Sequence, residues 1–295
     1  MTTVVLLAHS SDTIISQNIF CLFSLLHQVG ATGSGDLQIF IYTDQPARFQ
    51  KYFGDDSRIK YVELTPARVR EWRGSIDFVH RVKVEMLRDA GTKLSGQVKT
   101  TIFYVDGDTI FLKDPAPLFA KIDAKNSVMH ELENYLDEGR DPLSKKMARF
   151  LRKQWPAAYR KKQLSMDRAN ELNEHVAMWN SGVLGFTSDF VPRLDDVLRL
   201  TEELYTQYPK HVMEQLALSF YMQKCTHIHD AREYIFHYWR QKDAYNNWIA
   251  QFLSEHPNVE AAHRDFDLAR LPSVDIAAAK PDKLKWFKKW RSLRA

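Results

Sequence analysis

This chain has few cysteines and lacks the common glycine-rich motifs for phosphate binding. Its 295 residues include only two cysteines, Cys21 and Cys225, and these lack the spacing of a metal site. Isolated thiols of this kind suit a reducing cytoplasm and buried structural roles. No Gly-x-Gly-x-x-Gly follows the first apolar run, and no Walker-type lysine loop occurs anywhere. The sequence therefore offers no glycine cradle for a phosphate group.

Long apolar runs are absent as well. None approaches the ~20 residues that a helix needs to cross a bilayer. The N-terminal stretch MTTVVLLAHSSD has neither the positive start nor the cleavage site of a signal peptide, and it predicts a first strand instead. With 44% hydrophobic and 26% charged residues, the composition is typical of a soluble globular protein, and we expect a cytoplasmic one.

The formal net charge of +4 conceals a strong segregation of charge. Residues 139–168 hold ten Lys/Arg against two Asp, and residues 280–295 hold seven Lys/Arg against one Asp. These two segments carry +8 and +6, so the remainder of the chain carries −10. Basic segments of this kind indicate acidic partners rather than a particular fold.

Buried strands and helices alternate along the first third of the sequence. This alternation predicts an α/β fold with a mostly parallel sheet flanked by helices. The expected strands cover residues 4–8, 37–42, 59–64 and 101–105, and the expected helices cover residues 14–28, a short stretch from Pro46, and residues 75–90.

The second half of the chain is more elaborate and more helical. The simplest partition is one α/β domain over residues 1–279, with a basic helical insert at about 139–175, and a basic amphipathic tail at 280–295. Further strands are expected at 127–131 and 176–186, helices at 190–208 and 212–224, and an irregular aromatic stretch from Tyr234 onward.

An apolar strand leads directly into Asp106-Gly107-Asp108, within TIFYVDGDTIF. Alternate residues of an extended strand point the same way, so Asp106 and Asp108 can present two carboxylates on one side. Gly107 relaxes the backbone and keeps a side chain out of the way. Paired carboxylates suit a hard divalent cation, which can in turn neutralise a diphosphate. The alternative is an acidic turn, since Asp-Gly is a common turn dipeptide.

Polar residues also follow the first two expected strands. The stretch from Ala8 to Asp12 comes after the first strand, and Thr43-Asp44 comes after the second. In an open parallel sheet, ligands gather beyond the carboxyl ends of the strands. We therefore expect one site at this edge of the sheet, in which a metal rather than a glycine loop holds a diphosphate.

Three motifs in fixed order, YVDGDTIF, MWNSGVLGF and HVMEQLALSFYM, make the chain resemble the nucleotide-sugar glycosyltransferases of the GT-A fold. The resemblance is to the glycogenin-like and bacterial lipopolysaccharide glycosyltransferases, and it covers residues 4–242. It implies a GT-A type, Rossmann-like sheet with a helical C-terminal half. It also implies that Asp106 and Asp108 bind Mn²⁺ or Mg²⁺ and, through the ion, the donor diphosphate.

The resemblance assigns roles to further positions. It implies that the first-strand loop holds the nucleoside, that a basic residue on the helix before the Asp-Gly-Asp strand contacts the donor, and that two later motifs line the sugar pocket. The matching residues are Ala8, His9 and Asp12 for the nucleoside, Gly107 beside the metal, Arg81 or Lys83 for the donor, and Asn180, Gly182, Glu214 and Gln215 for the sugar pocket. The structural alternatives are exposed charges on helices for the basic residues and for Glu214.

A third metal ligand in this family is a histidine late in the chain, within a His-aromatic-x-Gly-x-x-Lys-Pro-Trp pattern. The best match here runs from His237, which would be the third metal ligand, to Lys242, which would bind the donor. It lacks the Gly and the Pro-Trp, and its lysine is one place closer. His229 is the rival ligand, and packing among aromatic neighbours is the structural alternative for His237. A histidine beside carboxylates would suit Mn²⁺ better than Mg²⁺.

The tail at residues 282–294, DKLKWFKKWRSLR, has the pattern of an interfacial helix. On a helix its aromatic side chains share one face and its lysines the other, which suits the headgroup layer of an anionic membrane. Nucleic-acid binding and a solvated helix packed on the domain are the alternatives, and we expect no nucleic-acid partner. The insert around residues 145–162 either adds to this surface, covers an acidic acceptor, or consists of solvated helices.

These observations predict a metal-dependent glycosyltransferase that moves a hexose from a nucleoside diphosphate sugar, most simply a UDP-sugar, to a hydroxyl of a carbohydrate or glycolipid acceptor. Surface polysaccharide or lipopolysaccharide synthesis would use such an enzyme. The resemblance implies retention at the anomeric carbon, whereas inversion would need a carboxylate near the acceptor. The alternatives are a nucleotidyltransferase of related fold and a noncatalytic membrane-surface binding module.

Overall fold

The computed structural model describes residues 1–30, 37–96, 100–139, 142–153, 176–256, 258, 261–262 and 265–272. The predicted tail at 280–295 lies outside these residues, and so does most of the predicted basic insert. Among the helices that are described, none combines the length and the apolar character that a membrane span requires.

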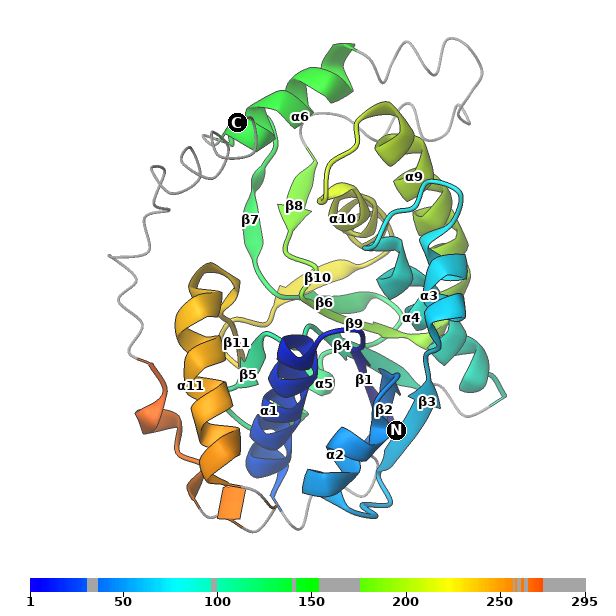
Figure 1. Ribbon diagram of the computed structural model, residues 1–295. Coiled ribbons are helices and arrows are strands. Elements are labelled where there is room, and N and C mark those ends of the chain that lie inside the picture. Colours follow the sequence, from blue (N-terminus) through cyan, green and yellow to red (C-terminus); the bar gives the residue numbers. More distant parts are fainter. Residues whose placement is uncertain are drawn as a thin grey trace.

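A seven-stranded sheet forms the centre of the molecule (Figure 1). Its strand order is β10-β6-β9-β4-β1-β2-β3, and β9 runs antiparallel to its neighbours β4 and β6 while the other pairs are parallel. The prediction of a mostly parallel sheet is therefore confirmed. The strands are β1 (Thr2–Ala8), β2 (Leu37–Thr43), β3 (Ile59–Glu63), β4 (Thr101–Val105), β6 (Asn126–Met129), β9 (Val183–Thr187) and β10 (His227–Asp230).

Helices cover both faces of this sheet. Val4 and Leu6 of β1 point into one apolar core and Val5 into the other, so the strand is buried on both faces and reads as a continuous apolar run. The first core is closed by α1 (Asp12–Val29), α2 (Pro46–Phe53) and α11 (Lys242–Glu255), and the second by α4 (Arg81–Lys93), α6 (Pro142–Lys153), α9 (Leu194–Gln207) and α10 (Met213–Cys225).

Two small antiparallel ladders form sheets of their own beside the central one. β5 (Thr109–Phe111) pairs with β11 (Ile235–His237), and β7 (Leu132–Tyr135) pairs with β8 (Ala177–Trp179). The strand expected over residues 176–186 is thus two strands, β8 and β9, in different sheets. The polar Asn180-Ser181-Gly182 segment is where the chain passes from one to the other.

The helix expected over residues 75–90 begins only at Arg81, and an unexpected helix, α3 (Pro66–Arg73), precedes it. The Thr65 hydroxyl caps α3 by accepting the backbone N–H of Arg68 at 3.1 Å. Gly74 then ends the helix with a φ of 67°, and Asp77 has a φ of 49°. Residues with a positive φ interrupt a helix, which is why the expected helix does not begin at residue 75.

The stretch from Tyr234 onward was expected to be irregular, and this prediction is wrong for the part that forms β11 and α11. Tyr245, Ile249 and Phe252 are buried at helical spacing, and the Phe252 ring lies 5.6 Å from that of Phe20 in α1. The remaining short elements are α5 (Ala116–Phe119) and the 3₁₀ helices η1 (Ser188–Arg193), η2 (Trp239–Gln241) and η3 (Leu268–Arg270).

Candidate functional site

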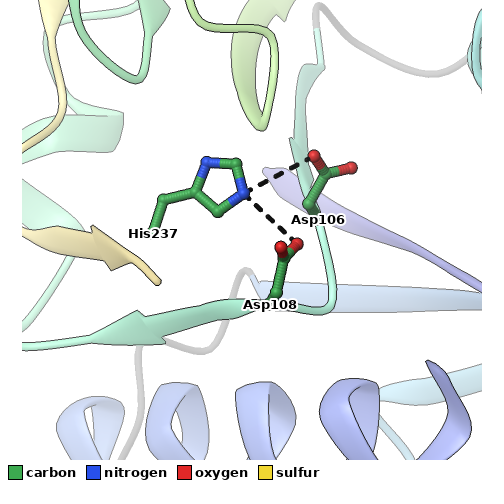
Figure 2. A group of neighbouring side chains, drawn as sticks. All are labelled: Asp106, Asp108 and His237. Carbon is green, nitrogen blue, oxygen red and sulfur yellow. Dashed lines mark ion pairs between the residues drawn. The ribbon is translucent and has the colours of Figure 1, made fainter. Parts of the chain in front are cut away.

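Three side chains from distant parts of the sequence converge beyond the end of β4 (Figure 2). The Nε2 atom of His237 lies 3.2 Å from Oδ1 of Asp108 and 3.9 Å from Oδ2 of Asp106. One potential ligand atom from each residue lies within 4.8 Å of the other two. Across the described ranges, no other group of three His, Cys, Asp or Glu side chains has such spacing.

His229, the rival histidine, lies elsewhere. It is on the edge strand β10, where its Nε2 is 3.1 Å from Oδ1 of Asn126. The structure therefore places His237 beside the two aspartates.

Strand pairing explains this convergence. Asp106-Gly107-Asp108 form the turn between β4 and β5, and β5 pairs with β11 so that Thr109 lies opposite His237. The backbone N–H of Asp106 donates to the carbonyl of Gly182 at 2.7 Å. The two carboxylates thus belong to a turn rather than to an extended strand, yet both face one imidazole.

Two glycines allow the surrounding groups to approach closely. A Cβ on Gly182 would lie 2.3 Å from Cε1 of His237, and a Cβ on Gly107 would lie 2.3 Å from Nδ2 of Asn18. The Asn18 amide is buried in α1, where it donates to the carbonyl of Leu7 at 3.2 Å. A side chain at either glycine would have to displace one of these anchored groups.

The geometry fits a divalent cation. Two carboxylates and an imidazole suit Mn²⁺. They also suit Mg²⁺, although Mg²⁺ has less preference for a nitrogen ligand. At metal–ligand distances of about 2.1 Å, adjacent ligands of an octahedral ion lie about 3 Å apart and opposite ligands about 4 Å apart. The separations of 3.2 and 3.9 Å from Nε2 of His237 fall in this range.

A buried ion pair lies next to this cluster. Nζ of Lys83 is 2.9 Å from Oε1 of Glu214 and donates to Oγ of Ser181 at 2.9 Å. Burial by itself lowers the pKa of Lys83, but Glu214 and Asp106 raise it above its ordinary value, so the ammonium group stays charged. Glu214 is only 2% exposed and is not a helix-surface carboxylate.

Arg81, the alternative to Lys83 as the donor contact, is engaged elsewhere. Its guanidinium lies 2.7 Å from Glu85 and 2.8 Å from Glu202, and it donates to the carbonyl of Trp72 at 2.7 Å. Of the two basic residues, Lys83 is therefore the one that the fold directs toward Asp106.

Tyr104 lies between Lys83 and Asp106. Its buried hydroxyl donates to Oδ1 of Asp106, and Nζ of Lys83 lies 5.3 Å from the centre of its ring. Sequence reasoning missed this residue. The available signal was its position in β4, two residues before Asp106, because residues two apart along an extended chain point to the same side.

Lys242, the first residue of α11, also reaches the cluster. Its Nζ lies 2.8 Å from Oδ2 of Asp108, and its side chain is half exposed. Burial alone would raise the pKa of Asp108, but His237 and Lys242 hold it well below the usual range. The carboxylate is therefore charged at neutral pH.

The loops after β1 and β2 are tied together at the same edge of the sheet. Ser10 has a φ of 69°, and its backbone N–H donates to the Asp44 carboxylate at 3.2 Å. Ala8 is buried at the end of β1, and the half-buried His9 has its Nδ1 2.5 Å from Oγ of Ser10. These groups form a polar rim next to the end of β4.

Asp12, the third residue predicted to hold the nucleoside, lies farther out. It begins α1, and its side chain is 83% exposed and forms an ion pair of 2.7 Å with Arg48 of α2.

Glu133 of β7 is a site residue that the sequence did not reveal. Its carboxylate accepts hydrogen bonds from Nδ2 of Asn180 at 3.0 Å and from Nε2 of Gln215 at 2.9 Å. It thereby joins two residues predicted to line the sugar pocket. Because the β7–β8 ladder is a pairing between segments about 40 residues apart, no local sequence pattern indicates it.

Among solved structures, the chain is similar to the galactosyltransferase LgtC, crystallised in complex with donor and acceptor sugar analogues. The TM-score is 0.51 at 12% sequence identity, over 78% of this chain and 74% of that chain. This protein has the GT-A fold. An active-site mutant of LgtC matches with a TM-score of 0.48 at 14% identity, over 78% of this chain and 73% of that one. No protein-family model and no curated protein sequence matches the chain.

In this GT-A chain the Asp106, Asp108 and His237 cluster lies beside the carboxyl ends of β1, β2 and β4. That edge of an open α/β sheet is where ligands bind in general. The fold and the cluster therefore point to the same place on the molecule.

Proposed function

We propose that this protein is a metal-dependent glycosyltransferase that moves a hexose from a nucleoside diphosphate sugar to an acceptor hydroxyl. The proposal is carried by the Asp106, Asp108 and His237 cluster at the ligand-binding edge of a GT-A fold. The galactosyltransferase of similar fold was crystallised with donor and acceptor sugar analogues, which supports these two substrate classes here. A UDP-sugar is the donor to test first, with a carbohydrate or glycolipid as acceptor.

Asp106, Asp108 and His237 would hold the Mn²⁺ or Mg²⁺ ion. When bound, such an ion neutralises the donor diphosphate and stabilises the charge that develops on it as the leaving group. The Tyr104 hydroxyl keeps one oxygen of Asp106 in place. Lys83 and the half-exposed Lys242 add positive charge at the same edge of the sheet.

Glu214 is paired with the Lys83 ammonium, so it is not a free general base. Because it is only 2% exposed, it would act by keeping Lys83 in place rather than by touching the sugar. Retention at the anomeric carbon does not require a free general base, because a retaining path can pass the acceptor proton to an oxygen of the leaving group. Gln215, the next residue of α10, would contact the transferred sugar.

The direct test is a panel of nucleotide sugars incubated with the protein and Mn²⁺, with release of nucleoside diphosphate as the readout. We expect slow hydrolysis of one donor class, abolished by EDTA and by Asp106→Asn. A nucleotidyltransferase would instead release pyrophosphate from a nucleoside triphosphate and a sugar phosphate. Failure of every donor to be cleaved or to bind would contradict the proposal.

We also propose that the protein contacts an anionic membrane surface. In α6 the ring of Phe150 stacks on Tyr208 with centroids 5.1 Å apart, so the apolar side of this helix faces the core. Lys145, Lys146 and Arg149 are exposed on the other side. Several clustered cations of this kind are attracted to anionic headgroups, and the basic sequence of the tail would add to the attraction.

Sedimentation with vesicles tests this surface. We expect binding to phosphatidylglycerol-containing vesicles but not to pure phosphatidylcholine, and we expect Lys145→Glu/Lys146→Glu/Arg149→Glu to weaken it. Binding should also fall as salt rises, because the attraction between exposed charges is screened. Equal binding of both vesicle types would contradict the proposal and leave the transferase activity unaffected.

A further inference from the structure

Asn180 was expected to line the sugar pocket, but its side chain is turned toward the metal cluster and only 6% of the residue is exposed. We infer that Asn180 is a positioning residue of the metal centre. Its amide oxygen fixes the ring of His237 in the tautomer that presents Nε2 to the ion. This inference rests on the proposed metal-dependent function and assigns the group that sets up one ligand.

Two contacts determine which way the Asn180 amide points. Its Oδ1 accepts the backbone N–H of Gly182 at 2.9 Å, and its Nδ2 donates to Oε1 of Glu133 at 3.0 Å. A backbone N–H can only donate, and an ionised carboxylate can only accept. The oxygen and the nitrogen of the amide are therefore distinguished by their partners.

The same oxygen determines which nitrogen of the His237 ring carries the proton. Nδ1 of His237 lies 3.1 Å from Oδ1 of Asn180. A carbonyl oxygen has no hydrogen to donate, so Nδ1 carries the proton of this hydrogen bond. In a neutral imidazole the lone pair is then on Nε2. That atom is the one 3.2 Å from Asp108 and 3.9 Å from Asp106.

The ring has little freedom to turn the other way. The side chain of His237 is 5% exposed, and Gly182 lies against its Cε1 and Nδ1. The His130 ring packs against it in a T-shaped arrangement with centroids 5.3 Å apart. Metal-binding histidines almost always donate their other N–H to an oxygen acceptor, which fixes the tautomer and the orientation of the ring. Asn180 occupies that place here.

Glu133 holds the amide from the far side. Its second oxygen accepts from Gln215 at 2.9 Å, so the carboxylate is fixed between two side-chain amides. A line of hydrogen bonds therefore runs from Gln215 on α10 through Glu133 and Asn180 to His237.

Mn²⁺ binding to the nucleotide-free protein tests the inference, read from the electron paramagnetic resonance signal of the free ion. We expect Asn180→Ala to weaken Mn²⁺ binding by about 10- to 100-fold, the usual effect of removing an outer partner of a metal ligand. The matched control is Asn126→Ala, which removes the amide bonded to His229 at 3.1 Å. It should leave Mn²⁺ affinity unchanged.

A double substitution separates positioning from general packing. Asn180→Asp alone would set a second carboxylate against Glu133 and should weaken Mn²⁺ binding. Glu133→Gln/Asn180→Asp reverses donor and acceptor only in the bond between residues 133 and 180. The carboxylate oxygen at 180 can still accept from Gly182 and His237, and the amide oxygen at 133 can still accept from Gln215. We therefore expect Mn²⁺ affinity within a few-fold of the natural protein. Glu133→Gln/Asn180→Ala should stay weak. Thermal unfolding of each variant identifies those that fail to fold.

The outcomes distinguish this inference from the proposed function. If the natural protein and a folded Asn180→Ala bind Mn²⁺ equally well, or if the double exchange gives no recovery, the inference is overturned and metal dependence survives. If the natural protein binds no Mn²⁺ with or without UDP, both are overturned.

Discussion

At the scale of single residues, the two carboxylates of the Asp-Gly-Asp turn are held by different partners. Asp106 accepts from the Tyr104 hydroxyl, whereas Asp108 lies 3.2 Å from His237 and 2.8 Å from Lys242. Asp108 is thus the carboxylate that pairs with the Lys242 ammonium group. Its removal would leave Lys242 without this partner.

We predict that Asp108→Asn lowers the affinity for Mn²⁺ with UDP by more than ~100-fold, because it removes a charged ligand rather than an outer partner. Isothermal titration calorimetry measures this. Asp195→Asn is the control, since Asp195 forms an exposed ion pair with Arg88 and belongs to no predicted part of the site. Equal affinities for Asp108→Asn and the natural protein would show that the carboxylate does not bind the ion.

The two cysteines should differ sharply in reactivity. Burial raises the pKa of Cys21 to about 12, with its thiol 3.2 Å from Oγ1 of Thr109, whereas Cys225 is exposed. Because a thiolate is the reactive form, Cys21 should stay unmodified by iodoacetamide at pH 8 while Cys225 reacts. Mass spectrometry of the native and the guanidinium-unfolded protein checks this. Native alkylation of Cys21 at the rate of Cys225 would contradict the burial.

At the scale of elements, β9 lies between β4 and β6, and two glycines let neighbouring side chains pack closely against this part of the chain. A Cβ on Gly182 would press on the His237 ring at 2.3 Å. A Cβ on Gly185 would meet Ile122 at 2.6 Å and Phe103 at 2.9 Å. The first glycine precedes the strand at the site, and the second lies inside the apolar core.

The two alanine substitutions should therefore have different effects. Gly182→Ala should weaken Mn²⁺ binding at least ~10-fold by moving His237. Gly185→Ala should lower the free energy of unfolding by about 1–3 kcal/mol through overpacking, with Mn²⁺ affinity unchanged. Calorimetry and urea unfolding measure the pair. The same loss of Mn²⁺ affinity in both variants would mean that β9 acts on the site as a whole.

At the scale of the whole molecule, the site draws its groups from segments as far apart in the chain as His9 and Lys242. A ligand that binds such a site binds the folded state only. At 100 times its Kd it stabilises the fold by about 2.7 kcal/mol. With an unfolding entropy of about 2.1 cal/mol/K per residue, this corresponds to a rise in Tm of about 4 °C for a chain of this length.

We predict that this rise appears with UDP and Mn²⁺ together and is absent with UDP and EDTA, as measured by differential scanning calorimetry. Mn²⁺ alone serves as the control for nonspecific effects of the ion. A rise of the same size with UDP and EDTA would mean that the nucleotide binds without the metal.

The sequence by itself determined the α/β character, the mostly parallel sheet and the position of the Asp106–Asp108 turn. These follow from the spacing of apolar residues and from turn chemistry, both of which act between neighbours in the chain. The motifs in their fixed order also indicated the GT-A fold, which the structure and its similarity to LgtC confirm.

Only the tertiary structure decided which of the candidate side chains meet. The β5–β11 register brings His237 rather than His229 to the aspartates, the packing of α4 and α9 engages Arg81 and leaves Lys83 for the site, and the β7–β8 ladder delivers Glu133. Each of these choices depends on contacts between segments far apart in the chain. Local periodicity carries no information about such contacts, because the same strand or helix pattern is compatible with many registers and partners.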